Sequence, residues 1–322
     1  MKKALVIGID NYPIAPLDGC ANDAQAVSCL LEKNWDGSPN FSVKLETEIL
    51  EKEELEALIE ELFTGNSDIS LLYFSGHGYL DGMGGYICTP DFKKYSAGVS
   101  MENILRYAEN NKECKNKVII FDCCHSSAIG ELQNSRQLSV VSDGLTILTA
   151  CRSNESAMEI DGHGVFTSLL LNALKGEAAN LKGEITPGSV YSYIDQALGP
   201  WEQRPVFKTN ITRFVSLRHS KPQISDSVVR KIIDYFPSPT SELHLDPSFE
   251  FTNSSTIEHE IIEPYANENN IRIFKDLQKL ESVGLIVPVG EEHMYFAAMK
   301  SKSCKLTDLG NYYWQLVKNK RF

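Results

Sequence analysis

Two short apolar runs, each ending in small and reactive residues, constrain this chain most. Residues 71–78 read LLYFSGHG, and residues 117–127 read KVIIFDCCHSS. Continuous runs of Ile, Val, Leu and aromatic residues are typical of buried parallel strands, and sites form where the carboxyl ends of such strands meet. We therefore expect His77 and Cys124 to face each other at one edge of a sheet. An imidazole beside a thiol accepts its proton and leaves a strongly nucleophilic thiolate.

A structural interpretation of this pair competes with the catalytic one. Cysteines are often simply buried, and a lone histidine is more often a structural residue than a catalyst. The glycines on either side of His77 favour catalysis, because Gly76 and Gly78 give the backbone freedom to present a ring and an amide at a cleft. Both reactive residues also end buried-strand patterns, so we predict catalysis.

The composition is that of an ordinary soluble globular chain with room for two domains: 322 residues, 42% hydrophobic and 23% charged. The net charge of -12 divides into -10 for residues 1–220 and -2 for residues 221–322. This charge disfavours nucleic acid and favours basic peptides as partners. No apolar run is long enough to span a membrane, and residues 1–12 lack a cleavage site for a signal peptide. Eight irregularly spaced cysteines predict a reducing cytoplasm rather than a disulfide framework.

Strand and helix patterns alternate through the first two thirds of the chain, which predicts a parallel sheet covered by helices. Strands are expected at residues 3–10, 43–50, 68–75, 86–89, 145–150 and 206–217 besides the cysteine strand. Helices are expected at residues 22–33, 52–63, 99–109, 163–174 and 186–198. Asn22 is the expected cap of the first helix. Residues 81–85, DGMGG, predict a hairpin turn.

SGHG followed by DCCHSS resembles the histidine and cysteine motifs of the caspase-like cysteine peptidases, closest to their metacaspase and orthocaspase branch. Matching segments extend over about the first 218 residues: KKALVIGIDNY, GCANDA, LTACRSNESA, HGVFTSLLLNAL and RPVFKTNITRFV. The resemblance implies a three-layer α/β sandwich around a mostly parallel six-stranded sheet. It also implies a Cys124 nucleophile, a His77 base and an oxyanion hole formed by the amides of Gly78 and Cys124.

The same resemblance implies cleavage after Arg or Lys, because four positions match the substrate pocket of the metacaspase branch. These positions are Cys20, Asp23, Ser75 and Asp122. Two carboxylates in a cleft can pair with a guanidinium or ammonium group, and Asp122 shares the strand parity of Cys124. The competing interpretation of Asp23 is a charge at a helix N-terminus.

We predict no metal and no cofactor. Three consecutive residues on an extended chain, such as 123–125, point to alternate faces and cannot converge on one tetrahedral ion. Calcium-dependent relatives carry an acidic insert after the histidine. Here Asp81 and Asp91 remain, with two lysines nearby, which is too few oxygens for a calcium cage. Ser127 replaces the usual glycine after His-Ser.

Residues 219–322 are expected to form a second domain, since helix, strand, turn, strand and helix patterns followed by LTDLG resemble a winged helix. We expect a helix at residues 226–236, a helix at 271–283, a strand at 285–289 paired with another at 295–299, and a closing helix at 306–317. Arg272, Lys275 and Lys279 of the candidate recognition helix are offset by Asp276 and Glu281. A protein partner is therefore favoured over DNA.

The function predicted is a regulated cytoplasmic endopeptidase that cuts after Arg or Lys, of a type linked to stress, cell death or defence. Arg136 lies in a polar stretch, residues 131–143, about a dozen residues after the nucleophile, so it is a candidate site of self-cleavage; a plain surface residue is the alternative. The competing functions are an inactive or weakly active caspase-like scaffold, or a regulator that binds protein or DNA through the second domain.

Overall fold

The computed structural model describes residues 1–92, 98–123, 141–150, 159–160, 163–198, 204–252, 258–263 and 266–322. The chain divides into two compact units, Met1–Lys221 and Pro222–Phe322. The predicted domain boundary after residue 218 lies close to this division.

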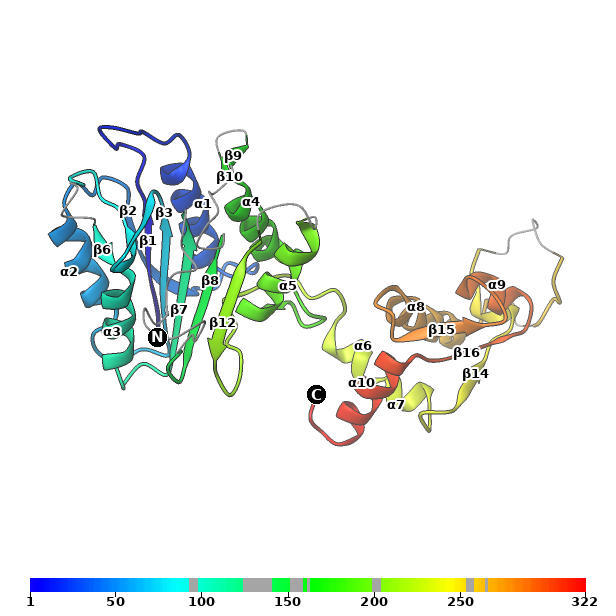
Figure 1. The fold of residues 1–322 in the computed structure, drawn as a ribbon. Coiled ribbons are helices and arrows are strands. Elements are labelled where there is room, and N and C mark those ends of the chain that lie inside the picture. The colour runs from blue at the N-terminus through cyan, green and yellow to red at the C-terminus, as the bar shows by residue number, and fades with distance from the viewer. Residues whose placement is uncertain are drawn as a thin grey trace. The chain divides into compact units, whose positions relative to one another are not determined.

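A six-stranded, mostly parallel sheet forms the centre of the first unit, in the order β12-β8-β7-β3-β1-β2 (Figure 1). Its strands are β1 (Lys2–Gly8), β2 (Phe41–Glu46), β3 (Ile69–Ser75), β7 (Asn116–Asp122), β8 (Leu145–Thr149) and β12 (Val206–Asn210). All neighbours pair in parallel except β12, which runs antiparallel to β8. The expected α/β sandwich with a six-stranded sheet is confirmed. The last strand is shorter than predicted, since it ends at Asn210.

Helices cover both faces of this sheet, because alternate side chains of each buried strand point to opposite sides. On one face lie α1 (Cys20–Glu32), α4 (Val165–Asn172) and α5 (Pro187–Ala197), which bury apolar residues against Val6, Tyr73 and Ile120. On the other face lie α2 (Lys52–Leu62) and α3 (Met101–Asn110), which pack on Ile7, Phe74 and Phe121. We name these the α1 face and the α2 face.

The first helix begins two residues earlier than predicted and is capped by a residue that follows β1. Asn22 lies inside α1, and its N-cap residue is Gly19, which makes no side-chain cap. The carboxylate of Asp10, just beyond β1, instead accepts hydrogen bonds from the backbone N–H groups of Gly19, Cys20 and Ala21, at 2.8 to 3.2 Å. This contact satisfies N–H groups that a helix start leaves unpaired and ties the start of α1 to the carboxyl edge of the sheet.

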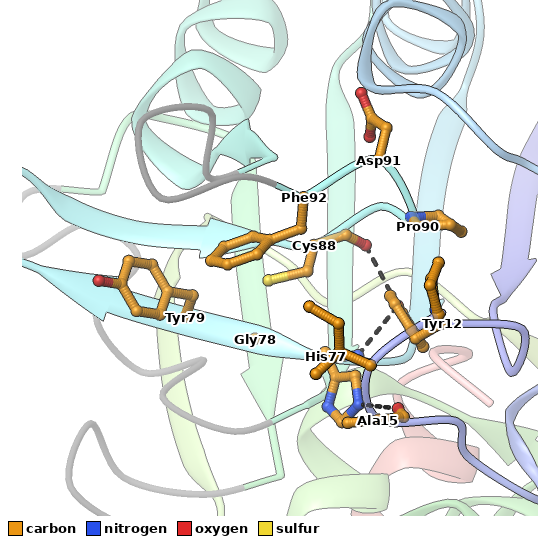
Figure 2. Close-up of a pocket in the computed structure, with 11 residues that line it drawn as sticks. Tyr12, Ala15, His77, Gly78, Tyr79, Cys88, Pro90, Asp91 and Phe92 are labelled. Carbon is orange, nitrogen blue, oxygen red and sulfur yellow. Dashed lines mark hydrogen bonds between the residues drawn. The ribbon is translucent and has the colours of Figure 1, made fainter.

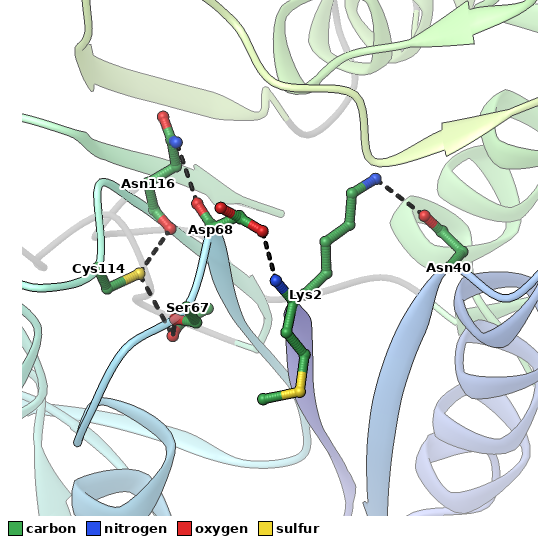
Figure 3. A network of polar contacts seen from close by, with 8 residues as sticks. Lys2, Asn40, Ser67, Asp68, Cys114 and Asn116 are labelled. Carbon is green, nitrogen blue, oxygen red and sulfur yellow. Dashed lines mark hydrogen bonds and ion pairs between the residues drawn. The ribbon is translucent and has the colours of Figure 1, made fainter.

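A polar network joins the strands at the opposite, amino edge of the sheet (Figure 3). The Asn116 amide donates to the Asp68 carbonyl at 3.1 Å, and the Asp68 carboxylate pairs with the N-terminal amine. Lys2 donates to Asn40 at 2.9 Å, which links β1 to the segment before β2. Structural polar contacts therefore hold this edge.

The chain after β3 forms a hairpin, as the Gly-rich turn predicts. Strands β4 (Gly78–Asp81) and β5 (Gly84–Ile87) pair antiparallel, and β6 (Val99–Ser100) joins β5. Two further pairs of two-residue strands occur: β9 (Glu159–Ile160) with β10 (His163–Gly164), and β11 (Glu184–Ile185) with β13 (Arg218–His219). One π-helical turn, η2 (Ala173–Glu177), continues α4.

The second unit combines short helices with a three-stranded antiparallel sheet in the order β14-β16-β15. Its elements are α6 (Asp226–Arg230), α7 (Ile232–Tyr235), β14 (Glu242–His244), η3 (Pro247–Phe249), α8 (Glu268–Ser282), β15 (Ile286–Val289), α9 (Met294–Met299), β16 (Ser303–Leu306) and α10 (Asp308–Lys318). The predicted strand at 295–299 is wrong, because this segment is the helix α9 and β15 pairs with β16. A stretch of Met, Phe and Ala is compatible with either element. Here the buried residues Met294, Ala297 and Ala298 follow the spacing of one face of a helix.

Within the described part of the chain, none of the helices combines the length and apolar character needed to cross a membrane.

Candidate active site

His77 lies just beyond the carboxyl end of β3, between Gly76 and the hairpin strand β4. Its Nε2 atom is 2.6 Å from the carbonyl oxygen of Ala15 (Figure 2). Because a carbonyl oxygen can only accept, Nε2 carries the hydrogen in this contact. The remaining ring nitrogen, Nδ1, is then the atom that can accept a proton.

A buried tyrosine holds the backbone of this histidine. The His77 N–H donates to the Tyr12 hydroxyl at 3.0 Å, and that hydroxyl donates to the Cys88 carbonyl at 3.1 Å. The two rings lie against each other with centroids 4.5 Å apart. Burial raises the pKa of Tyr12 well above its usual value, so the hydroxyl keeps its proton and donates throughout the neutral range.

Gly76 is required for space. A Cβ atom there would lie 2.5 Å from the Tyr12 hydroxyl and 2.8 Å from the Phe74 ring. The φ angle of Gly76 is not positive, so backbone conformation is not the reason for a glycine here. The predicted need for glycine beside His77 therefore has a specific cause, which is the close approach of Tyr12.

The amide of Gly78 points away from the hairpin ladder. The Cys88 N–H donates to the His77 carbonyl at 2.8 Å, so these two residues form a hydrogen-bonded position of the β4–β5 pairing. Bonded and non-bonded positions alternate in antiparallel pairs, and Gly78 pairs with Ile87 at the next position. The Gly78 N–H is therefore directed away from β5 and takes no part in the β4–β5 ladder.

Two buried carboxylates, Asp23 on α1 and Asp122 at the end of β7, lie next to the same residue, Gly164. Their side chains are 1% and 5% exposed. Asp23 accepts from the Gly164 N–H at 3.0 Å, and a methyl group on Gly164 would collide with the Asp122 carboxylate. Asp122 accepts from the N–H and the hydroxyl of Thr167, at 3.2 and 2.7 Å. Burial, and then the negative charges of Asp122 and Asp23, raise the pKa of Tyr73 well above its usual value.

The two other residues predicted for the pocket are buried close by in the fold. Ser75 is the last residue of β3 and pairs in register with Asp122. Cys20 is the first residue of α1, where its N–H donates to Asp10. The carboxyl edge of the sheet therefore brings Asp23 and Asp122 together and places Ser75 beside them.

The predicted nucleophile Cys124 and the candidate cleavage residue Arg136 lie outside the described residues. The last described residue before them, Cys123, is fully buried in the core of the α2 face. Asp122 instead contacts α4 on the α1 face, so these two neighbours point to opposite sides as strand parity requires. The register pairs Ser75 with Asp122, and His77 and Cys124 each follow two residues later in the sequence.

A pocket of about 470 Å³ adjoins His77 on the side of the hairpin (Figure 2). Its described lining is largely apolar: Tyr12, Pro13, Ile14, Ala15, His77, Gly78, Tyr79, Cys88, Pro90, Asp91 and Phe92. None of the four predicted pocket residues lines it. The carboxyl edge thus carries an acidic region and a separate apolar one.

The sequence matches the model of the caspase domain family over residues 1–216. The chain belongs to the caspase-domain family. Comparison with curated protein sequences gives no significant match. Among solved structures, protein GSU0716 from Geobacter sulfurreducens is similar with a TM-score of 0.51 and 16% identity, covering 69% of this chain and 98% of that one. Caspase-1 from Spodoptera frugiperda has a TM-score of 0.50 and 17% identity, covering 68% and 90%.

Membership of the caspase-domain family implies a cysteine peptidase that acts on proteins or peptides. Within the ranges that the structure describes, no group of three or more His, Cys, Asp or Glu side chains is arranged to hold a metal ion. The described cysteines form no disulfide with one another.

Three residues that contribute to this caspase-domain site were not predicted from the sequence. Tyr12 and Ala15 lie in the segment after β1, and Thr167 lies in the first turn of α4. The motif segments that contain Tyr12 and Thr167 were singled out as matches, but nothing local shows that a hydroxyl holds His77 or that a threonine binds Asp122. The Ala15 contribution is a backbone carbonyl, which carries no signal in the sequence.

Proposed function

We propose that this caspase-domain protein is a cysteine endopeptidase in which Cys124 is the nucleophile, His77 is the base and the residue before the scissile bond is Arg or Lys. The observation that carries the proposal is the contact that orients the His77 ring. Its Nε2–H is committed to the Ala15 carbonyl at 2.6 Å, which leaves Nδ1 as the proton acceptor at the carboxyl edge of the sheet.

The chemistry follows from that arrangement. Nδ1 takes the proton of the Cys124 thiol, and the thiolate attacks the scissile carbonyl to form a tetrahedral intermediate. Its oxyanion accepts hydrogen bonds from the amides of Gly78 and Cys124. The protonated imidazole then gives its proton to the leaving amine, and water hydrolyses the acyl-enzyme with the same histidine as base.

The preference for a basic residue rests on Asp23 and Asp122. Two carboxylates that share one small region repel each other, and an arriving guanidinium or ammonium group relieves that repulsion. In a buried region such a pair is stronger than at the surface, because the local dielectric is low. Ser75 and Cys20, the two other residues expected in the pocket, have small side chains. The same acidic region repels an Asp side chain, which argues against cleavage after Asp.

The test uses quenched peptides that differ in the residue before the scissile bond: Arg, Lys, Asp or Ala. We expect cleavage of the Arg and Lys peptides by the wild type and a loss of roughly 10⁴-fold or more in Cys124→Ala and His77→Ala. Cys123→Ala is the matched control, because this neighbouring thiol is buried in the core of the α2 face. Full activity in Cys124→Ala, or a preference for Asp, contradicts the proposal.

We also propose that the enzyme works in the reducing cytoplasm as a regulated protease, since its nucleophile must stay a thiol. Its physiological substrates are the proteins cut in a lysate by the wild type but left intact by Cys124→Ala. A role in stress, cell death or defence predicts that the extent to which these proteins are cut changes when the cell is stressed.

For residues 219–322 we propose a winged-helix-like regulatory domain that contacts a protein. Support comes from the order of α8, β15 and β16 and from the antiparallel sheet. The cations of α8 are partly engaged: Lys275 lies 5.1 Å from the centre of the Phe251 ring, and Arg272 contacts Asn269. Binding of the full chain to duplex DNA at low salt, weakening steeply as salt rises, would instead favour the DNA-binding alternative.

A further inference from the structure

His77 separates two regions of different chemistry at the carboxyl edge of the sheet. The acidic region lies on the α1 face, where Asp122 contacts Thr167 of α4. The apolar pocket lies toward the α2 face, since Tyr12 and Cys88 belong to the core of that face and Phe92 packs against it. A peptide that crosses the edge past His77 therefore meets both regions in turn.

The pocket is built as a preformed apolar site. Tyr79 and Phe92 meet edge to face with centroids 5.4 Å apart, and Figure 2 shows these rings forming one wall above His77. Ile14 is 90% exposed and Tyr79 is 38% exposed at this pocket, so apolar surface stays in contact with water. An apolar ligand that covers this surface releases that water, which is favourable.

The carboxylate in the lining, Asp91, already has a partner. It accepts a hydrogen bond from the Thr89 hydroxyl at 2.6 Å, and in Figure 2 it lies away from His77. The part of the pocket next to the imidazole is therefore apolar.

We propose that this pocket binds a bulky apolar side chain of the residue that follows the scissile bond. The inference rests on the proposed function and extends it to the leaving-group side. If the acidic region holds the residue before the bond, the bond lies near His77, and this histidine protonates the amine of the next residue. That residue then enters the pocket beside the imidazole, and the lining of this pocket includes apolar surface of Ala15, Ile14 and Tyr79.

The test compares quenched peptides that share Arg before the bond and differ only in the residue after it: Leu, Phe, Gly, Asp or Lys. We expect kcat/KM for the Leu and Phe peptides to exceed that for the Gly peptide on the order of tenfold, the size of effect that an apolar pocket produces. Asp should be the poorest, because it brings a charge into an apolar site.

Two neighbouring residues of β4 provide matched variants. Tyr79 lines the pocket, whereas Leu80 does not, and their exposures are 38% and 39%. Tyr79→Ser should lower the Leu-to-Gly ratio of kcat/KM several-fold, and Leu80→Ser should leave the ratio unchanged while both cut the Gly peptide.

The outcomes separate this inference from the proposed function. Cleavage of all peptides after Arg at equal rates keeps the proposed function and overturns the pocket assignment. A preference for Lys after the bond also overturns it and points to Asp91 as the dominant group. If no peptide is cut, the proposed function itself fails, and this inference fails with it.

Discussion

Replacing Tyr12 by Phe removes one oxygen atom from the bridge that holds His77. In the wild type that hydroxyl accepts from the His77 N–H at 3.0 Å and donates to the Cys88 carbonyl at 3.1 Å. Phe fills almost the same volume, so no cavity forms. The change therefore isolates the loss of two hydrogen bonds at the active site.

The expected cost follows from removing one hydrogen bond from each of two backbone groups. Each buried group that loses its partner costs about 1–3 kcal/mol, and the His77 amide is only partly buried, so we expect about 2–4 kcal/mol in total. With a urea dependence of roughly 2 kcal/mol per M, the midpoint of unfolding falls by about 1–2 M. The rate on the Arg peptide should fall too, since the backbone that carries the base is less well held.

Tyr107→Phe is the control. Its hydroxyl donates to Glu56 at 3.0 Å in a partly buried setting, and the Asn103 amide also donates to Glu56, so about 1 kcal/mol or less is expected. Hydrogen exchange measured by mass spectrometry at increasing urea, read on peptides from β3, reports the first unit alone. Equal stability of the Tyr12→Phe and Tyr107→Phe chains would refute the reasoning.

Three further predictions concern the pocket, alkaline pH and self-cleavage. Asp23→Asn and Asp122→Asn should each lower kcat/KM on the Arg peptide by the equivalent of about 2–5 kcal/mol, with a smaller loss on an Ala peptide. Equal losses on the two peptides would mean that the carboxylates have a structural role alone. A calcium chelator should leave the wild-type rates on both peptides unchanged. Folding raises the pKa of Tyr73 above 10.0, so Tyr73 loses its proton more readily in the unfolded chain than in the folded one. Its contribution to the free energy of unfolding is therefore full below pH 10 and falls as the pH rises further. Tyr73→Phe should flatten that fall in urea titrations between pH 9 and 12. Incubation of wild type and Cys124→Ala followed by mass spectrometry should show a cut after Arg136 in the wild type only, and an intact, fully active wild-type chain would count against self-cleavage.

The sequence was sufficient for the alternation of strands and helices and for the position of His77 at the end of a buried strand. These features depend on local apolar periodicity, which each segment carries by itself. It also indicated that Asp122 and Cys123 point to opposite sides, because strand parity is a property of the backbone. The same local argument failed at residues 295–299, where an apolar run is compatible with both helix and strand.

Only the tertiary structure decided which distant groups complete the site. The cap of α1 comes from Asp10 rather than Asn22, and the orientation of His77 depends on the Ala15 carbonyl and the Tyr12 hydroxyl. Gly164 lies next to both Asp23 and Asp122 although it is far from both in the sequence. Such contacts depend on how loops from different strands meet at one edge of the sheet. No local pattern encodes them, because a backbone carbonyl or amide is chemically the same at every residue type that can supply it.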